Sequence, residues 1–197
     1  MSTAPAEPRL SATVLLIRDR AEMEVLMVAR HYEIDFAAGA LVFPGGKANS
    51  EDSQPEWEDH IDGRFEPEQQ TARIAAVREA FEESGLLLAR KKDNRGKGKP
   101  LVAGDVAEKL EPMRRLVDKG EVSFLELIKE HDLVLAIDSL EHFAHWITPE
   151  MMPKRFNTHF YIATAPADQI ASHDGYETTD ARWIAPNEAL VLSLIHI

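Results

Sequence analysis

The chain has 197 residues, of which 44% are apolar and 28% charged, the balance of one medium-sized globular domain with a sizeable core. It contains no cysteine, which excludes a disulfide framework, a thiolate metal site and a cysteine nucleophile, so any metal must be held by oxygen or histidine. The net charge of -12 argues against general nucleic-acid binding, but it is compatible with a nucleotide bridged by a metal ion.

The first nine residues are small, polar and proline-containing, so we expect 1–9 to be poorly ordered and 10–197 to form a single domain. The N-terminus lacks a basic stretch followed by an apolar run. No apolar run in the chain approaches the roughly 18 residues that span a bilayer. We therefore expect a cytoplasmic protein that does not enter a membrane.

The N-terminal part alternates β-rich runs with turns. It predicts strands at 12–18, 24–30 and 40–43, with a charged turn at 19–22 and a loop at 31–39. The first two strands form a hairpin, and the third leads into a turn that contains Gly45 and Gly46. These glycines allow positive φ and close approach of another group. Lys47 is suited to neutralising a phosphate, although a solvated lysine is the commoner case.

An acidic segment follows at 49–70, with eight acidic residues and one arginine. Such a run is usually a solvated loop, but Trp57 and Phe65 indicate that parts of it pack against the core. Pro67 suits the first turn of a helix, which predicts that the central helix begins there.

The central helix carries three glutamates on one face. Glu79, Glu82 and Glu83 fall within about 100° of one another, whereas the apolar residues Ile74, Val77 and Phe81 take the opposite face. Gly85 supplies the left-handed residue that ends the helix. Like charges this close repel by a few tenths of a kcal/mol per pair, so a divalent cation held by their oxygens would compensate.

These residues resemble a known family. REAFEESGL, from Arg78 to Leu86, is similar to the second half of the Nudix box, R-E-U-x-E-E-x-G-U, where U is a bulky aliphatic residue and Ala80 is a small version of it. LVFPGGK, from Leu41 to Lys47, resembles the strand and glycine loop that open the same box. The two halves together are specific, since an acidic helix or a Pro-Gly-Gly turn alone is common.

The spacing within the box departs from the family pattern G-x5-E-x7-R-E. Counted back from Arg78, the glutamate of the pattern would fall at Gln70 and the glycine at Arg64. An insertion of about 18 residues, covering about 48–66, repairs the spacing at little cost in loop-closure entropy. Glu66 and Glu68 are then the nearest candidates for the first glutamate, which in the family is a supporting or outer metal ligand.

A second insertion is expected at 90–131. Its first part, 90–99, has six basic residues and two glycines and predicts a flexible exposed loop or, alternatively, an electropositive flap that attracts a phosphorylated substrate. Two helices follow at 106–118 and 124–131, and Pro112 kinks or divides the first. Each begins with a capping-box pattern, Asp105 with Glu108 and Ser123 with Glu126. The block indicates a lid or an interface.

The C-terminal part returns to β-rich runs. Strands are predicted at 132–138, 141–148, 156–164 and 177–184, followed by a helix at 186–190 and by LVLSLIHI, apolar and uncapped, which suggests a truncated or foreign end. Histidines 142 and 145 lack metal-ligand spacing and are taken as packing or surface residues.

Two short signatures refine the resemblance. The segment Trp146-Ile147-Thr148-Pro149 and the segment RFNTHF at 155–160 resemble the W-x-T-P and R-F-D-T-x-F motifs of a Nudix branch similar to coenzyme A diphosphatases. Asn157 replaces the usual aspartate, and the upstream L-L-T-x-R motif of that branch is matched only loosely at 26–30. That branch also carries a long insertion in the box.

The resemblance implies the fold and the chemistry. The fold is the α+β Nudix α/β/α sandwich, with a mixed sheet and an added helical insertion. The activity is metal-dependent hydrolysis of a pyrophosphate in a nucleoside diphosphate derivative, foremost coenzyme A or acyl-coenzyme A. The alternatives are the same chemistry on NADH, ADP-ribose or a dinucleotide, or a non-catalytic ligand sensor. The partner is a small nucleotide substrate, and a homodimer is compatible with the sequence.

The resemblance also assigns roles to residues. Mg²⁺ or Mn²⁺ is held by Glu79, Glu82 and Glu83, and Arg78 orients a carboxylate, so that Arg78, Glu79 and Glu82 are the expected catalytic group. Gly45, Gly46 and Lys47 are the expected substrate-binding residues. The general base stays open among Glu79, Glu141 and Glu177.

Overall fold

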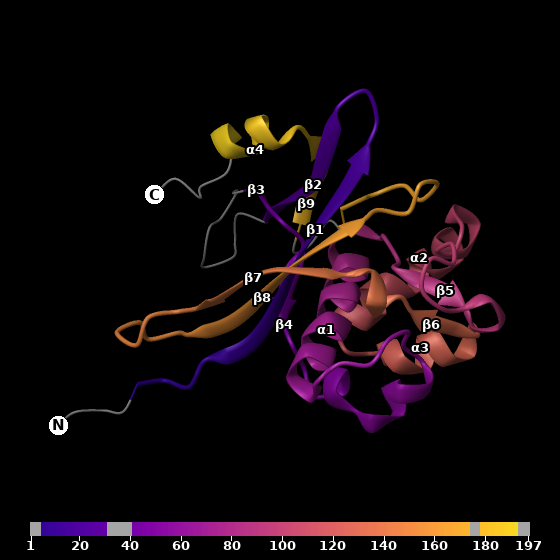
Figure 1. Ribbon diagram of the computed structural model, residues 1–197, viewed down its shortest axis with the longest axis horizontal. Helices are drawn as coiled ribbons and strands as arrows, with labels where there is room; N and C mark the ends of the chain where they lie inside the picture. Colours follow the sequence, from indigo (N-terminus) through magenta and orange to yellow (C-terminus); the bar gives the residue numbers. More distant parts are fainter. Residues whose placement is uncertain (1–4, 31–40, 174–177, 193–197) are drawn as a thin grey trace.

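The structure is a computed structural model that describes residues 5–30, 41–173 and 178–192. Its main sheet contains β1 (Arg9–Asp19), β2 (Met23–Arg30), β3 (Leu41–Val42), β4 (Gly45–Lys47), β7 (Glu141–Ile147), β8 (Phe156–Thr164) and β9 (Thr178–Ile184). The order is β3-β2-β1-β8-β7, with β4 added to β1 and β9 to β2 (Figure 1). β1 and β8 run parallel and the other pairs are antiparallel, so the sheet is mixed as predicted.

Helices cover both faces of this sheet. On one side lie α1 (Pro67–Ser84), α2 (Gly104–Asp118) and α3 (Phe124–Glu130), and on the other lies α4 (Pro186–Leu192) (Figure 1). The alternation of β1 explains the two layers, because Ala12, Val14 and Leu16 enter the core under α1, whereas Leu15 and Ile17 pack towards α4. The predicted α/β/α sandwich is therefore confirmed.

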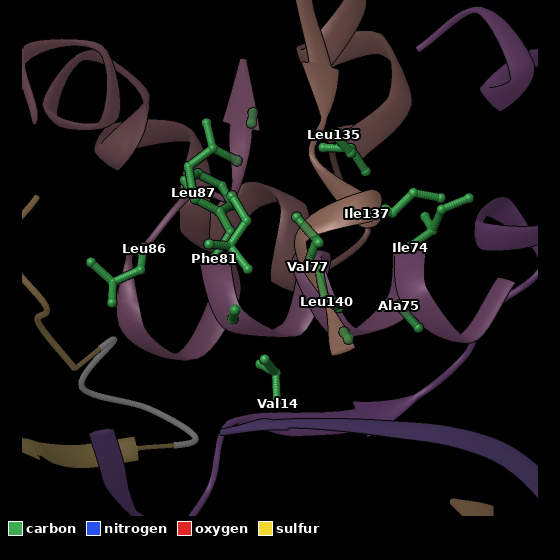
Figure 2. Close-up of a cluster of buried hydrophobic side chains, with 14 of the residues drawn as sticks. Val14, Ile74, Ala75, Val77, Phe81, Leu86, Leu87, Leu135, Ile137 and Leu140 are labelled. Atoms are coloured by element: carbon green, nitrogen blue, oxygen red, sulfur yellow. The ribbon is translucent and has the colours of Figure 1, made fainter. Parts of the chain in front are cut away.

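The central helix α1 lies at the middle of the larger core. Figure 2 shows Ile74, Val77 and Phe81 among the buried apolar side chains on the side of α1 that faces Leu135 and Ile137, whereas Val14 of the sheet lies on the other side of the helix. Pro67 opens the helix, and Gly85, with φ 71°, ends it as predicted. We expected its acidic face to be exposed, but Arg78, Glu82 and Glu83 are buried as well. Segments that are remote in sequence cover that face too.

One covering segment is the acidic insertion, which contains the short 3-10 helices η1 (Glu51–Ser53) and η2 (Pro55–Asp59). The packing predicted from Trp57 and Phe65 is confirmed, whereas the expectation of a solvated loop is wrong for Asp52 and Asp62, which are buried too. Trp57 Nε1 donates to the Glu51 carbonyl at 2.9 Å, and the Trp57 ring packs on Phe124 of α3 at 5.9 Å between centroids. The acidic side chains on the outer side remain in solvent.

The basic segment 90–99 is also more ordered than predicted. It spans β5 (Ala89–Lys91), which pairs with β6 (Leu133–Leu135), and the 3-10 helix η3 (Lys92–Asn94). Arg90 is buried and its Nη1 contacts Asp62 at 2.8 Å and Asp138 at 2.5 Å. Arg95 Nε contacts Asp62 at 2.9 Å. Two of the six basic side chains that the alternative interpretation assigned to an electropositive flap, Arg90 and Arg95, are therefore paired with aspartates.

Local capping rules succeeded at one helix and failed at another. Ser123 caps α3, since its hydroxyl accepts from the Glu126 amide at 3.1 Å. Helix α2 instead begins at Gly104 without a side-chain cap, so the predicted cap at Asp105 is wrong, and it continues through Pro112 undivided. The run 132–138 holds only β6 and then the 3-10 helix η4 (Ile137–Ser139).

Ordered pairing starts at Arg9, one residue inside the segment expected to be poorly ordered. The predicted loop at 31–39 and most of the terminal run LVLSLIHI lie outside the described residues. In the described ranges, none of the helices is both long and apolar enough to cross a membrane.

Candidate active site

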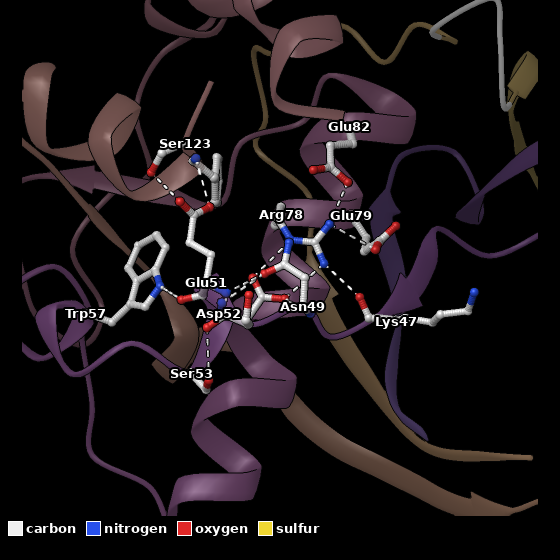
Figure 3. A network of polar contacts seen from close by, with 12 residues as sticks. Lys47, Asn49, Glu51, Asp52, Ser53, Trp57, Arg78, Glu79, Glu82 and Ser123 are labelled. Carbon is white, nitrogen blue, oxygen red and sulfur yellow. Dashed lines mark hydrogen bonds and ion pairs between the residues drawn. The ribbon is translucent and has the colours of Figure 1, made fainter. Parts of the chain in front are cut away.

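The guanidinium of Arg78 is the centre of a buried polar network (Figure 3). Asp52 of η1 accepts two hydrogen bonds from it: Arg78 Nε donates to Oδ1 and Arg78 Nη2 donates to Oδ2, both at 3.0 Å. Nη1 contacts Glu82 Oε2 at 2.7 Å and Glu79 Oε1 at 3.0 Å, and Nη2 donates to the Lys47 carbonyl at 2.8 Å. One cation thus fixes two glutamates of α1, the glycine turn and the insertion.

Asp52 is the residue that sequence reasoning missed. Glu66 and Glu68, the predicted candidates for the first glutamate of the box, are exposed at the start of α1, and Glu68 contacts His159 at 3.2 Å instead of Arg78. Asp52 follows Gly46 with five residues between them, the G-x5-E spacing with aspartate for glutamate. The insertion therefore lies after Asp52 and not from residue 48. That spacing, counted forward from the glycine, was the available signal.

The two glycines are needed because other groups approach them closely. The Gly45 amide donates to Glu83 Oε2 at 2.9 Å. A Cβ built on Gly46 would lie 2.5 Å from the carboxylate of Glu79, and one on Gly45 would lie 2.4 Å from the Ala12 carbonyl oxygen. The turn therefore orients Glu83 directly and leaves room for Glu79, which joins the predicted turn to the predicted acidic helix.

Lys47 takes part through its backbone. Its carbonyl accepts from Arg78, while its side chain is exposed and extends away from the carboxylates (Figure 3). We predicted that the Lys47 ammonium group neutralises a phosphate. No contact between that group and the network around Arg78 supports this role.

Burial and neighbouring charge perturb this cluster. Burial raises the pKa of Glu82 to about 8, with Arg78 opposing the shift and the carboxylates of Glu79, Asp118 and Asp52 adding to it. Burial alone would lower the pKa of Arg78, but Asp52 and the two glutamates raise it well above its ordinary value, so Arg78 stays charged. The network as it stands favours an additional positive charge near Glu82.

The donor set suits a hard cation in its chemistry. Glu79, Glu82 and Glu83 offer oxygen ligands within two turns of one helix. In the described part of the chain, no three Asp, Glu or His side chains converge into a preformed metal site. The three glutamates contact protein groups instead of one another. Arg78 forms ion pairs with one oxygen each of Glu79 and Glu82, and the Gly45 amide donates a hydrogen bond to one oxygen of Glu83. An ionised carboxylate has about four lone-pair sites on its two oxygens, so one hydrogen bond does not by itself prevent it from binding a cation.

The candidates for the general base separate in space. Glu79 belongs to the network around Arg78. Glu141 is exposed on β7 and interacts with Arg73, more than two helical turns before Glu82. Glu177 lies outside the described residues.

The histidines of β7 pack as predicted. His142 Nε2 lies 3.2 Å from Nδ1 of the buried His159, and the ring of His145 stacks on His159 with centroids 4.2 Å apart. Gln69 and Glu68 of α1 hold the two nitrogens of His159 from the other side, at 3.1 and 3.2 Å. This cluster joins the start of α1 to the β7–β8 hairpin.

Comparisons with known proteins agree on one family. The family model of the NUDT19 Nudix domain matches residues 58–194. The chain is 29% identical over 209 residues to the acyl-coenzyme A diphosphatase NUDT19 of Xenopus laevis, covering 86% of the chain and 54% of the relative. It is 26% identical over 180 residues to the putative nudix hydrolase 7 of Caenorhabditis elegans, covering 91% and 52%. The chain thus spans about half the length of these curated relatives.

A solved structure shows the same fold. The crystal structure of a NUDIX hydrolase from Alicyclobacillus acidocaldarius superposes with a TM-score of 0.78 at 24% identity, covering 94% of this chain and 82% of that one.

Proposed function

The chain belongs to the family of NUDT19 Nudix domains, and from that premise we propose that it hydrolyses a pyrophosphate bond in a nucleoside diphosphate derivative, with coenzyme A or acyl-coenzyme A as the substrate. The observation that carries the proposal is the network around Arg78, which gathers the carboxylates of Glu79 and Glu82 next to a glycine turn that holds Glu83. A sensor without turnover would not need this arrangement of acids.

We propose that Mg²⁺ or Mn²⁺ is held by Glu79, Glu82 and Glu83. When bound, such a cation offsets the charge of phosphate oxygens and lowers the pKa of a coordinated water. The protein's own contribution is orientation: Asp52 fixes the plane of Arg78, Arg78 fixes two of the glutamates, and the Gly45 amide fixes the third. Because Asp52, Arg78, Glu82 and Glu83 are buried, they need little reorganisation during the reaction.

The choice of substrate rests on the named relatives. The coenzyme A signatures of the sequence lie in the β7–β8 hairpin and not beside the carboxylates. There, Thr148 Oγ1 accepts from the Phe156 amide at 3.0 Å, and Arg155 Nε donates to the Thr148 carbonyl at 3.0 Å. These residues close the hairpin turn, so their structural role is clear and they carry no direct evidence for the ligand. NADH, ADP-ribose and dinucleotides therefore remain the competing substrates.

A substrate panel with Mg²⁺ or Mn²⁺ tests the proposal. Coenzyme A and its acyl esters should yield 3′,5′-ADP and the matching phosphopantetheine, identified by mass, faster than NADH, ADP-ribose or a dinucleotide is cleaved. Faster cleavage of one of those competitors would keep the hydrolase and replace the substrate. The absence of cleavage across the panel, with one of the nucleotides still bound, would favour the sensor.

Glu83→Gln and Glu68→Gln form a matched pair on the same helix. Glu83→Gln should lower kcat by orders of magnitude while leaving the fold intact, as checked by circular dichroism. Glu68→Gln, exposed and far from Arg78, should keep wild-type kcat. Wild-type turnover in Glu83→Gln would remove that residue from the site.

A further inference from the structure

Strand β7 presents an apolar surface at the edge of the main sheet. It is the last strand in the sheet order, and among the described residues no strand pairs with its outer edge. Six of its seven residues are exposed. Five large apolar residues are exposed within ten positions of the chain: Phe143 (63%), Trp146 (66%), Ile147 (51%), Met151 (88%) and Met152 (48%). A long apolar edge of this kind favours association with another chain.

The hairpin that carries this surface is held firmly. Figure 1 shows β7 and β8 projecting past the helices, side by side with the start of β1. Trp146 packs on Phe160 of β8 at 5.5 Å between ring centroids, and His145 stacks on the buried His159. The contacts of Thr148 and Arg155 close its turn. Little conformational entropy is therefore lost if another chain docks here.

The size of the surface suits an interface. With about 200 Å² for a large side chain, the five exposed fractions correspond to about 600 Å² of apolar surface on one copy. This area is divided between the turn and the two faces of the strand, because Trp146 packs on Phe160 on one face and Ile147, the next residue, points to the other. A standard interface buries about 800 Å² on each partner, and the backbone of the edge would supply part of the remainder. Pairing of two edges places both faces of each strand beside the partner strand, so apolar side chains on both faces contribute to the contact.

The charge distribution favours a second copy of this chain as the partner. Two chains of net charge -12 repel each other, so they can associate only through a surface with few acids. The run Ala144–Ile147 has no acidic residue, and the nearest acids in the chain are Glu141 at the start of β7 and the exposed Glu150 in the turn after it. The irregular register between His142 and Ala144 limits regular pairing to this run. A strand edge can pair antiparallel with its own copy about a two-fold axis.

We propose that the β7–β8 hairpin is the dimer interface of this protein, formed by antiparallel pairing of two β7 edges over residues 144–147 and covered by the neighbouring apolar side chains. The interface is separate from the carboxylates around Arg78 and would stand even if the proposed hydrolysis were wrong.

Sedimentation velocity over a range of concentrations tests the interface. The wild type should sediment as a dimer, and Trp146→Glu and Ile147→Glu should each yield monomers with an unchanged circular dichroism spectrum. Met23→Glu is the matched control, because Met23 is an equally exposed apolar residue at the start of β2, and it should stay dimeric. A monomeric wild type, open-ended assembly, or dimers that persist in both hairpin variants would overturn the proposal.

The absence of cysteine allows a second test of the pairing. Single cysteines placed in turn at positions 144–147 should form disulfides between copies, most efficiently at the position nearest the two-fold axis. A cysteine at position 23 should form none. Equal cross-linking at position 23 and in the hairpin would contradict the antiparallel arrangement.

Discussion

Replacing Asp52 by asparagine tests whether this residue orders the site. Asp52 is buried and its carboxylate accepts from Arg78 Nε, Arg78 Nη2 and the Asn49 amide at 2.9–3.0 Å. Asparagine keeps one acceptor oxygen but turns the other position into a donor that faces donors. Breaking a buried ion pair costs about 3–5 kcal/mol, while a hydrogen bond to a charged group contributes about 1.5–3 kcal/mol.

The loss should lie near the lower end of that range. Arg78 keeps Glu79, Glu82 and the Lys47 carbonyl, so its charge stays compensated. We expect Asp52→Asn to lose about 3 kcal/mol of unfolding free energy, which corresponds to a melting temperature lower by about 6–12 °C in a domain of this size. Because Arg78 loses the fork that fixes its plane, activity or metal affinity should also fall by about 10–100-fold.

Urea unfolding and steady-state kinetics measure the two effects, with Glu56→Gln as the control. Glu56 is an exposed acid of the same insertion, so its replacement should change neither quantity. If Asp52→Asn unfolds at the same urea concentration as Glu56→Gln and turns over at the wild-type rate, Asp52 does not order the site and the insertion begins elsewhere.

Three further outcomes are expected. Gly46→Ala should fold but lose activity, because the new Cβ displaces the Glu79 carboxylate. Gly45→Ala should lower the melting temperature, because its Cβ meets the backbone of β1. Equal effects of the two variants on activity and on melting temperature would contradict this difference. Mn²⁺ at about 100 times its Kd should stabilise the wild type by about 2.7 kcal/mol, and a variant lacking the Glu83 carboxylate should respond much less; an equal thermal shift would place the ion elsewhere. Burial lowers the pKa of His159 in the folded protein, although Glu68 opposes the shift. The unfolded chain therefore binds more protons, and the free energy of unfolding should fall as pH drops from about 6.5 through the lower native pKa. Acid titration of His159→Gln should show a shallower decline, and an unchanged profile would exclude His159 as the cause.

The box was readable from the sequence because its second half is local. Arg78, Glu79, Glu82 and Glu83 follow one another on a single helix, where the 3.6-residue repeat alone places them near one another. The β1–β2 hairpin was readable for the same reason, since alternation and a charged turn are short-range signals. The family resemblance followed from these contiguous residues, and the comparisons confirm it.

The spacing from Gly46 marks Asp52 as a candidate, but local pattern cannot show that Asp52 pairs with Arg78. Asp52 is separated from Arg78 by the insertion, and only packing of η1 against α1 brings the two within 3.0 Å. Glu66 and Glu68 were nearer along the chain yet lie at the wrong end of the helix. The burial of Arg90 against Asp62 and Asp138 is another long-range outcome that charge counting in a basic loop could not reveal.

Sequence by itself therefore determined the family, the acidic helix and the glycine turn, because each depends on the order of neighbouring residues. Tertiary structure decided which charges are buried and paired. A buried charge requires a partner from wherever in the chain one can reach it, and distance along the sequence carries no information about that choice.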